Sequence, residues 1–373
     1  MPKKPYHIML SGGGTGGHIF PAIAIADGLK KAFPDADFLF VGAKGRMEME
    51  KVPQAGYPII GLWISGIQRK LTISNLAFPF KLISSTIKAR KIIRNFKPDV
   101  VIGTGGYASG PLLHAAAGKN IPTLILEQNS YPGLTNKWLS KTVDRICVAY
   151  PGMDKYFPKS KMIVTGSPIR KEIMLASGNK TEGCVFFGLN PELPTLLIIG
   201  GSQGARQINL AIASNLKKLL EGSIQILWQT GVNGFDEAQN QAKQLPNQDR
   251  VVITKFIQRM DLAYAAADVI VSRAGAIAIA EIVSVKKPAI LIPLPSAAED
   301  HQTQNALSLV KENAGILVKE STANEVLADQ VLSLMNNNAL RKNISQNLSH
   351  FDHKDATLAI VEQVKLLMKG GVE

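Results

Sequence analysis

Cysteine and long apolar runs are the first things that this sequence lacks. Its 373 residues include two cysteines, Cys147 and Cys184, which cannot build a disulfide framework and have no partner at the spacing of metal ligands. No run of about 18 apolar residues occurs, so we expect no membrane-spanning helix. The opening MPKKPYHIML is basic, but its apolar run is too short for a signal peptide. These absences favour a cytoplasmic protein that is soluble or held at a membrane surface.

Acidic residues are absent from residues 51–98. Residues 1–170 hold 23 basic and 9 acidic residues, a net charge of +14, whereas residues 171–373 hold 19 and 20, a net charge of −1. The acid-free stretch mixes cations with aromatic residues, among them Arg69, Lys70, Lys81, Trp63, Phe78 and Phe80. This mixture suits an anionic membrane surface, where rings enter the interface and cations meet phosphates. A core helix with a solvated basic face is the main alternative, and nucleic acid is a weaker one because no nucleic-acid motif accompanies the charge.

The overall composition excludes global disorder, since 46% of residues are apolar and 19% are charged. The length exceeds that of one hydrophobic core, so two domains are expected. Short apolar runs alternate with helix-like segments, which is typical of α/β folds with parallel sheets. The expected strands are 7–10, 38–41, 100–102, 123–126, 145–148 and 162–164 in the first half, and 195–199, 224–228, 251–254, 269–271 and 289–292 in the second.

A polar region containing Gly and Pro begins near residue 166 and sets the predicted boundary. We expect a first domain over residues 1–166 and a second over 167–355. Residues 356–373 then form a C-terminal segment whose helix, 356–368, packs back on the first domain.

Glycine-rich loops follow three of the expected strands: HIMLSGGGTGGH (7–18), IGTGGYASGP (102–111) and TLLIIGGSQGAR (195–206). The two halves open alike, and this weak internal repeat predicts two similar doubly wound domains. Glycines let backbone amides approach a phosphate, and the helix that follows adds a favourable partial charge. Three such loops predict an extended, phosphate-bearing ligand in a cleft between the domains.

The first loop also fits a dinucleotide-binding motif, because Gly12, Gly14 and Gly17 match G-x-G-x-x-G. The acid that binds ribose in that motif is absent, since residues 42–44 read Gly-Ala-Lys. A dinucleotide-dependent oxidoreductase is therefore a weaker alternative. A non-catalytic basic binding protein is weaker too, because the second half carries a ligand loop without excess charge.

Two residues in the first loop carry chemistry. Thr15 supplies a hydroxyl, and His18 supplies an imidazole that can act as general base or hold a neighbouring acid. A histidine that only packs or caps the helix is the plain alternative. Glu127 lies at a strand end, the edge where such sheets bind ligands, and is either a second candidate base, a group that orients His18, or a structural hydrogen-bond acceptor.

The motifs GGTGGH, TGGYASGP, EQN with PGLTNKWLSK, GSPIR, GGSQGAR and SRAGA with AEI occur in this order between about residues 7 and 305. In order and spacing the sequence resembles the bacterial peptidoglycan glycosyltransferases of the MurG family. The resemblance implies a GT-B fold, with two Rossmann-like domains and the active cleft between them. It implies an inverting transfer of N-acetylglucosamine from UDP-N-acetylglucosamine to undecaprenyl-pyrophosphoryl-N-acetylmuramyl-pentapeptide (lipid I to lipid II), without metal or cofactor, by a peripheral enzyme on the cytoplasmic face of the membrane. Another GT-B enzyme, such as a glycolipid synthase or a sugar-nucleotide epimerase, is the alternative.

The resemblance also implies roles for single residues. Thr15, Gly16, Gly17 and His18 would face the sugar and the acceptor. Asn129 and Arg170 would contact the donor from the first-domain side, Ser202 its diphosphate, Ile257 the uracil through the backbone, Glu281 the ribose hydroxyls and Gln302 the sugar hydroxyls.

This sequence departs from some relatives in two ways. Ala274 and Ala278 replace hydroxyl-bearing residues of those relatives, so backbone amides would hold phosphate there. The length of the chain around Gln302 and Gln304 varies among relatives, which leaves open which glutamine contacts the sugar. The residues themselves agree with the implied chemistry, because a charged Glu281 inside the apolar run AIAIAEIV needs partners.

Overall fold

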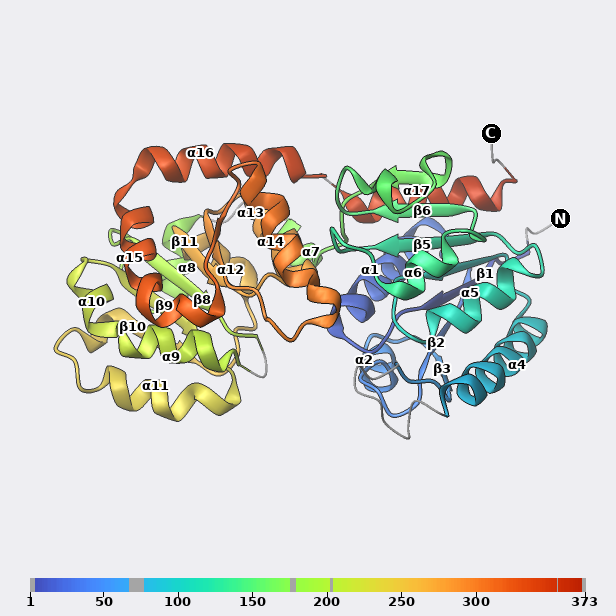
Figure 1. Ribbon diagram of the computed structural model, residues 1–373, viewed down its shortest axis with the longest axis horizontal. Helices are drawn as coiled ribbons and strands as arrows, with labels where there is room; N and C mark the ends of the chain where they lie inside the picture. The colour runs from blue at the N-terminus through green and yellow to red at the C-terminus, as the bar shows by residue number, and fades with distance from the viewer. Residues whose placement is uncertain (1–3, 67–76, 175–178, 202–203, 354, 371–373) are drawn as a thin grey trace. The chain divides into compact units, whose positions relative to one another are not determined.

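The computed structural model describes residues 4–66, 77–174, 179–201, 204–353 and 355–370. The chain divides into two compact units (Figure 1). The first runs to Ile169 and includes the chain from Asp355 onward, and the second is Arg170–Lys354. Among the described residues, no helix combines the length and the apolarity that crossing a membrane requires.

The first unit is built on a parallel sheet of seven strands in the order β3-β2-β1-β4-β5-β6-β7. The strands are β1 (His7–Ser11), β2 (Asp37–Ala43), β3 (Ile59–Leu62), β4 (Val100–Gly103), β5 (Thr123–Glu127), β6 (Arg145–Val148) and β7 (Met162–Val164). The central strands are buried along most of their length, which is why they read as unbroken apolar runs in the sequence.

Helices cover this sheet: α1 (Gly16–Ala32), α2 (Glu48–Gln54), α4 (Phe78–Phe96), α5 (Ser109–Ala117), α6 (Leu134–Leu139) and α17 (Ala356–Met368). The last of these, the helix expected at 356–368, packs against α1. Gly28 permits the close approach, because a Cβ there would lie 2.7 Å from Cγ2 of Thr357. Ile360 and Val364 of α17 enter the same apolar core as Ile25 of α1. The end of the chain is thus part of the first core.

The second unit has a parallel sheet of six strands in the order β10-β9-β8-β11-β12-β13. They are β8 (Thr195–Ile199), β9 (Gln225–Gln229), β10 (Val251–Thr254), β11 (Val269–Ser272), β12 (Ala289–Leu291) and β13 (Ile316–Leu317). The helices are α7 (Lys171–Met174), α8 (Lys180–Phe186), α9 (Arg206–Ser214), α10 (Leu216–Glu221), α11 (Phe235–Ala242), α12 (Met260–Ala266), α13 (Ala276–Val285), α14 (His301–Lys311), α15 (Ala323–Asn336) and α16 (Asn338–Leu348).

Both sheets reverse their strand order next to their first strand. In the first unit the reversal lies between β1 and β4, where Ser11 is paired with Gly103. In the second it lies between β8 and β11, where Ile199 is paired with Ser272. Doubly wound sheets bind ligands beyond the carboxyl ends of their strands at such a point. The fold therefore places a glycine loop at each of the two positions where a ligand is expected.

The predicted doubly wound α/β architecture is confirmed, and each of the eleven expected strands is present. The sequence reasoning missed β3 and β13. Both are edge strands of two to four residues. They give no long apolar run, because an edge strand is only half covered.

Candidate active site

In the first unit, the loops after β1 and β4 lie against each other. The amide of Gly13 donates to the carbonyl of Gly105 at 3.3 Å. Gly106 has a φ of 88°, and a Cβ there would lie 2.2 Å from the carbonyl oxygen of Gly13. The glycine cluster at 102–111 is therefore needed for contact with the first glycine loop.

His18 is held in one tautomer by this loop. Its Nδ1 lies 3.0 Å from the carbonyl oxygen of Gly13 and 3.3 Å from Oγ1 of Thr15. A carbonyl only accepts, so Nδ1 carries the proton and Nε2 of the neutral ring carries the lone pair. Gly105 leaves room at that edge, because a Cβ there would lie 2.9 Å from Nε2. This arrangement is the one that a general base requires.

Thr15 precedes α1 in the N-cap position, with extended backbone, yet its side chain makes no capping bond. Its hydroxyl lies beside His18 instead. Gly16 and Gly17 form the first turn of α1, which contains no acidic residue. A Cβ on Gly16 would lie 3.1 Å from the ring of Phe20. Three of the four residues predicted to face the sugar and the acceptor, Thr15, Gly16 and Gly17, thus lie at the positive end of a helix dipole.

Glu48 holds the same loop through hydrogen bonds, and it was not among the site residues predicted from the sequence. The residue is fully buried. Its Oε1 accepts from the amide of Ala43 at 2.9 Å, and its Oε2 accepts from the amide of Gly14 at 3.0 Å. A dinucleotide loop would offer such an amide to a pyrophosphate. Since Glu48 already occupies the Gly14 amide, the geometry argues against the dinucleotide alternative.

Glu127 is buried at the end of β5 and accepts four hydrogen bonds. Oε1 accepts from the backbone amide and side chain of Asn129 at 3.0 and 3.1 Å, and Oε2 accepts from Gly133 and Asn136 at 3.1 and 2.9 Å. Burial raises the pKa of this carboxyl, and the four donors oppose that rise. The bonds organise the loop after β5, which agrees with the structural role left open by the sequence.

In the second unit, Glu281 of α13 is buried and joined to two side chains. Its Oε1 accepts from Nε of Arg170 at 2.9 Å and lies 2.8 Å from Nη2 of the same guanidinium. Its Oε2 accepts from the hydroxyl of Tyr264 at 2.9 Å. Burial raises the pKa of Glu281, and Arg170 and then Tyr264 work against this rise. The structure thus brings together Arg170 and Glu281, which lie 111 residues apart and were both predicted from the motifs.

Tyr264 is a second residue that the sequence reasoning missed. It lies on α12 and is almost fully buried, and its pKa is raised by burial and then by the neighbouring Glu281. A signal existed, because Tyr264 is a hydrogen-bonding residue inside the apolar segment LAYAAA. A buried carboxylate on a nearby helix needs such a donor.

Ile257 and Gln302, two other predicted donor contacts, bond to other groups of the second unit. The amide of Ile257 donates to Oε1 of Gln229 at 3.3 Å, a long bond. Gln302 uses Oε1 to accept from the amide of Leu294 at 2.9 Å, whereas Gln304 is exposed. Ser202 lies outside the described residues.

Two helices of the second unit begin without side-chain caps near the β8–β11 reversal. Ala205 precedes α9 and Gly275 precedes α13, and neither makes a side-chain capping bond. Gly204 has a φ of 83°, and a Cβ there would lie 2.4 Å from the carbonyl oxygen of Thr230. Among the described residues, no N-cap side chain bonds the first amides of either helix, an arrangement that suits an anion.

Sequence comparison agrees with this geometry. The profile of the glycosyltransferase family 28 N-terminal domain matches residues 8–148, and that of the family's C-terminal domain matches residues 195–359. The chain belongs to glycosyltransferase family 28. The match confirms the transferase class that the motifs predicted.

This family 28 chain has close relatives over nearly its whole length. It is 53% identical over 365 residues to the UDP-N-acetylglucosamine--N-acetylmuramyl-(pentapeptide) pyrophosphoryl-undecaprenol N-acetylglucosamine transferase of Cytophaga hutchinsonii, covering 98% of both chains. It is 49% identical to the protein of that name from Flavobacterium psychrophilum, covering 98% of this chain and 99% of the relative. The crystal structure of Acinetobacter baumannii MurG is 30% identical, with a TM-score of 0.80, covering 97% of this chain and 99% of that one. The predicted GT-B fold and MurG resemblance are confirmed.

Proposed function

We propose that this chain transfers N-acetylglucosamine from UDP-N-acetylglucosamine to undecaprenyl-pyrophosphoryl-N-acetylmuramyl-pentapeptide, the step from lipid I to lipid II in peptidoglycan synthesis. The observation that carries the proposal is the full-length identity of 53% and 49% to two transferases named for this reaction. The two sites support it, because one holds a histidine with a fixed tautomer and the other a buried carboxylate beside uncapped helix starts.

The donor belongs to the second unit in this proposal. Glu281 binds the ribose hydroxyls, the backbone at Ile257 contacts uracil, and Gln302 or Gln304 contacts the sugar. The uncapped starts of α9 and α13, with Arg170, offset the charge that develops on the departing UDP. Ser202 belongs to this diphosphate site by resemblance. Asn129 is assigned a donor contact by resemblance as well.

The acceptor hydroxyl attacks the anomeric carbon from the face opposite UDP, so the configuration inverts. Nε2 of His18 takes the proton of that hydroxyl, because Nδ1–H is engaged with Gly13. The bond between the anomeric carbon and the diphosphate oxygen breaks with its electron pair leaving on UDP. Thr15, Gly16 and Gly17 lie beside the imidazole at the start of α1 and face the reacting sugars.

The experiment that tests the function is turnover of radiolabelled UDP-N-acetylglucosamine with the lipid-linked acceptor. We expect radiolabel in the lipid product and release of UDP. A thermal-shift comparison of UDP, UDP-N-acetylglucosamine, NAD and a short oligonucleotide checks the site separately, because a ligand specific for the folded state raises Tm. Stabilisation by NAD alone, without sugar transfer, would contradict the proposal.

A membrane-facing role for the acid-free stretch is part of the proposal, because the acceptor's lipid stays in the bilayer. Phe80, Ile83 and Ile87 of α4 are 71%, 60% and 62% exposed. Trp63 is 53% exposed, and Nζ of Lys81 lies 5.8 Å from the centroid of its ring. Exposed apolar residues beside a cation suit an anionic lipid surface.

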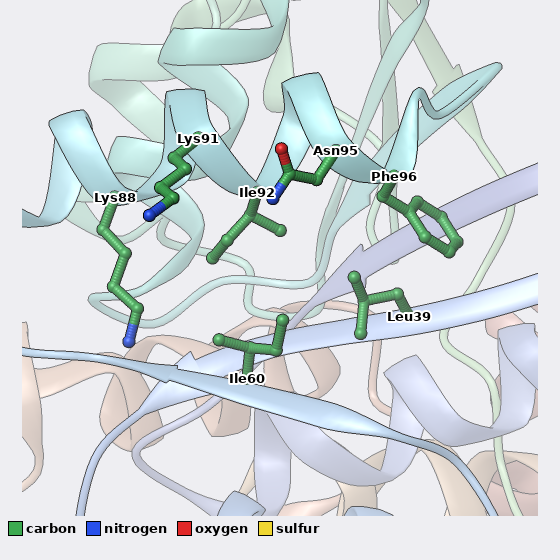
Figure 2. A pocket seen from close by; sticks show the side chains of 7 residues that line it. All are labelled: Leu39, Ile60, Lys88, Lys91, Ile92, Asn95 and Phe96. Carbon is green, nitrogen blue, oxygen red and sulfur yellow. The ribbon is translucent and has the colours of Figure 1, made fainter.

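A groove of about 420 Å³ lies between α4 and strands β2 and β3. Figure 2 shows Lys88 and Lys91 toward one end, and Ile92 of α4 facing Leu39 and Ile60 on the strands. Burial and then the nearby Lys44 lower the pKa of Lys88. The lysines of this groove add cations near the exposed apolar residues of α4, which supports the proposal that α4 faces an anionic membrane surface.

Vesicle flotation tests the membrane face. Arg69→Glu, Lys70→Glu and Lys81→Glu together should reduce binding to vesicles containing anionic lipid, because each cation near such a surface contributes about 1 kcal/mol. Binding of the parent should weaken with salt without vanishing, since the apolar part is insensitive to salt. Arg69 and Lys70 lie outside the described residues. If the triple variant floats as well as the parent, the membrane contact lies elsewhere.

A further inference from the structure

The carboxylate of Glu281 is almost fully occupied by the protein itself. A carboxylate offers about four acceptor positions. Arg170 uses two at Oε1, through Nε and Nη2, and the hydroxyl of Tyr264 uses one at Oε2. One position remains. The two vicinal hydroxyls of a ribose need two, so both cannot bind while Arg170 keeps its two contacts.

Of the two protein partners, Arg170 is the one exposed to solvent, and so the one that a ligand can displace. The side chain of Arg170 is 43% exposed, and the residue directly follows the last residue of the first unit. Tyr264, in contrast, is almost fully buried on α12. Glu281 is 4% exposed and cannot be left with an unpaired charge. Two ribose hydroxyls together with Tyr264 supply three donors, the same number that Arg170 and Tyr264 supply without ligand.

We propose that donor binding exchanges Arg170 for the ribose at Glu281 and transfers the freed guanidinium to the diphosphate. This exchange rests on the proposed function, which assigns the ribose to Glu281. Tyr264 is then a positioning residue that keeps one donor on the carboxylate throughout. A guanidinium pairs well with phosphate oxygens, so a ligand with a diphosphate compensates for the lost ion pair. A nucleoside without phosphate does not.

Because of the exchange, the site binds well only a ligand that carries both a ribose and a diphosphate. Uridine must displace Arg170 and gives it no new partner, whereas UDP displaces it and binds it. The free energy of breaking the Arg170–Glu281 pair therefore lowers affinity for uridine. This cost in binding free energy favours the nucleoside diphosphate over the nucleoside. It comes from the ion pair between Arg170 and Glu281 in the ligand-free protein.

The test is titration calorimetry of uridine and UDP against the parent and Arg170→Ala, at pH 8. We expect the variant to bind uridine about tenfold more tightly. Uridine no longer has to break a charge-assisted hydrogen bond between Arg170 and Glu281, and a tenfold change in Kd corresponds to the net free energy of about one such bond. UDP should not gain, because its phosphate contact is lost as well. The ratio of the uridine Kd to the UDP Kd then falls by at least tenfold.

If Arg170 only contacts phosphate, Arg170→Ala would leave the affinity for uridine unchanged. If Arg170 only positions Glu281, the variant would bind uridine more weakly. Either result, in a folded variant, would contradict the proposed exchange. The proposed function would still stand as long as the parent binds UDP. A parent that binds neither ligand overturns both. Arg170→Lys keeps a charge for the buried carboxylate, and we expect an intermediate gain for uridine. Lys218→Ala is the matched control, since Lys218 is a 47% exposed cation paired with Asp329 in the same unit, and it should change neither affinity.

Discussion

The two glycine loops occupy equivalent positions in two similar sheets, but their surroundings differ. After β1, the amides of Gly13 and Gly14 donate to Gly105 and Glu48, and the loop holds an imidazole. After β8, the loop leads into α9 without a side-chain cap, and α13 beside it also begins without one. In the second loop the amides of Gly200 and Gly204 also donate to backbone carbonyls, those of Gln229 and Gly201. What distinguishes the first loop is the buried carboxylate and the imidazole that contact it.

This difference shows how one architecture can serve two tasks. A loop that fixes the tautomer of an imidazole suits proton transfer by that histidine. A loop beside uncapped helices suits a diphosphate leaving group. The predictions below act on one loop or the other, so that turnover and donor binding can be separated.

The largest effect is expected from His18→Ala. Turnover should fall by about 10²–10⁴-fold if the imidazole is the general base, because the acceptor hydroxyl loses its proton acceptor. Donor affinity, measured by calorimetry, should change little. His114→Ala removes an exposed histidine of the same unit and serves as the control. A loss confined to donor binding would make His18 a positioning residue and Glu127 the better candidate for the base.

Glu281→Ala acts on the other site. Donor affinity should fall by about 10–100-fold, because charge-assisted hydrogen bonds contribute roughly 1.5–3 kcal/mol each. Selectivity for uracil should persist, since that contact is assigned near Ile257. Competition between UDP and other nucleoside diphosphates measures both quantities. Unchanged donor affinity in the folded variant would contradict the ribose assignment.

Glu48→Gln tests whether the first loop needs its buried brace. The NH₂ group of glutamine is a donor and would face the backbone N–H of Ala43 or Gly14, which is also a donor. One buried hydrogen bond is then lost, which lowers the free energy of unfolding by about 1–3 kcal/mol. We expect a lower Tm and turnover reduced by about tenfold, with donor affinity unchanged. Glu50→Gln, on the same helix with its side chain 67% exposed, is the control and should behave like the parent. Equal stability of the two variants would show that the loop is held by Gly105 alone.

The smallest effect concerns stability and pH in Arg170→Ala. Arg170 holds down the pKa of Glu281, which burial raises from its ordinary value of 4.5, so the variant's carboxyl has a still higher pKa. A raised folded-state pKa means that the folded protein binds more protons than the unfolded chain above pH 4.5, so stability falls as pH rises. The variant should therefore lose more stability at pH 8 than at pH 5, by about 1–2 kcal/mol given the exposure of Arg170.

Denaturant unfolding at the two pH values measures this difference. The parent should change less between them, because Glu281 keeps its ion pair. A loss that is the same at pH 5 and pH 8 would mean that the carboxyl does not titrate in this range.

Local patterns in the sequence predicted the repeated features of this fold. The buried strands β1, β4 and β5 are visible because a strand covered on both faces must be apolar throughout. The helix Ala356–Met368 is visible because its apolar positions recur with helical spacing. The edge strands β3 and β13 were missed for the opposite reason, since their pattern is short and only half buried.

The site divides in the same way. The sequence alone determined which residue types stand at the strand ends and in the helices that follow them. These are the glycines and Glu127 at strand ends, and His18 and Glu281 in the helices that follow. Only the tertiary structure decided how they are used. Glu48 reaches Gly14 across 34 residues, and Arg170 reaches Glu281 across 111. Neither partnership follows from spacing, because a buried carboxylate requires donors but its sequence does not say which distant helix or loop supplies them.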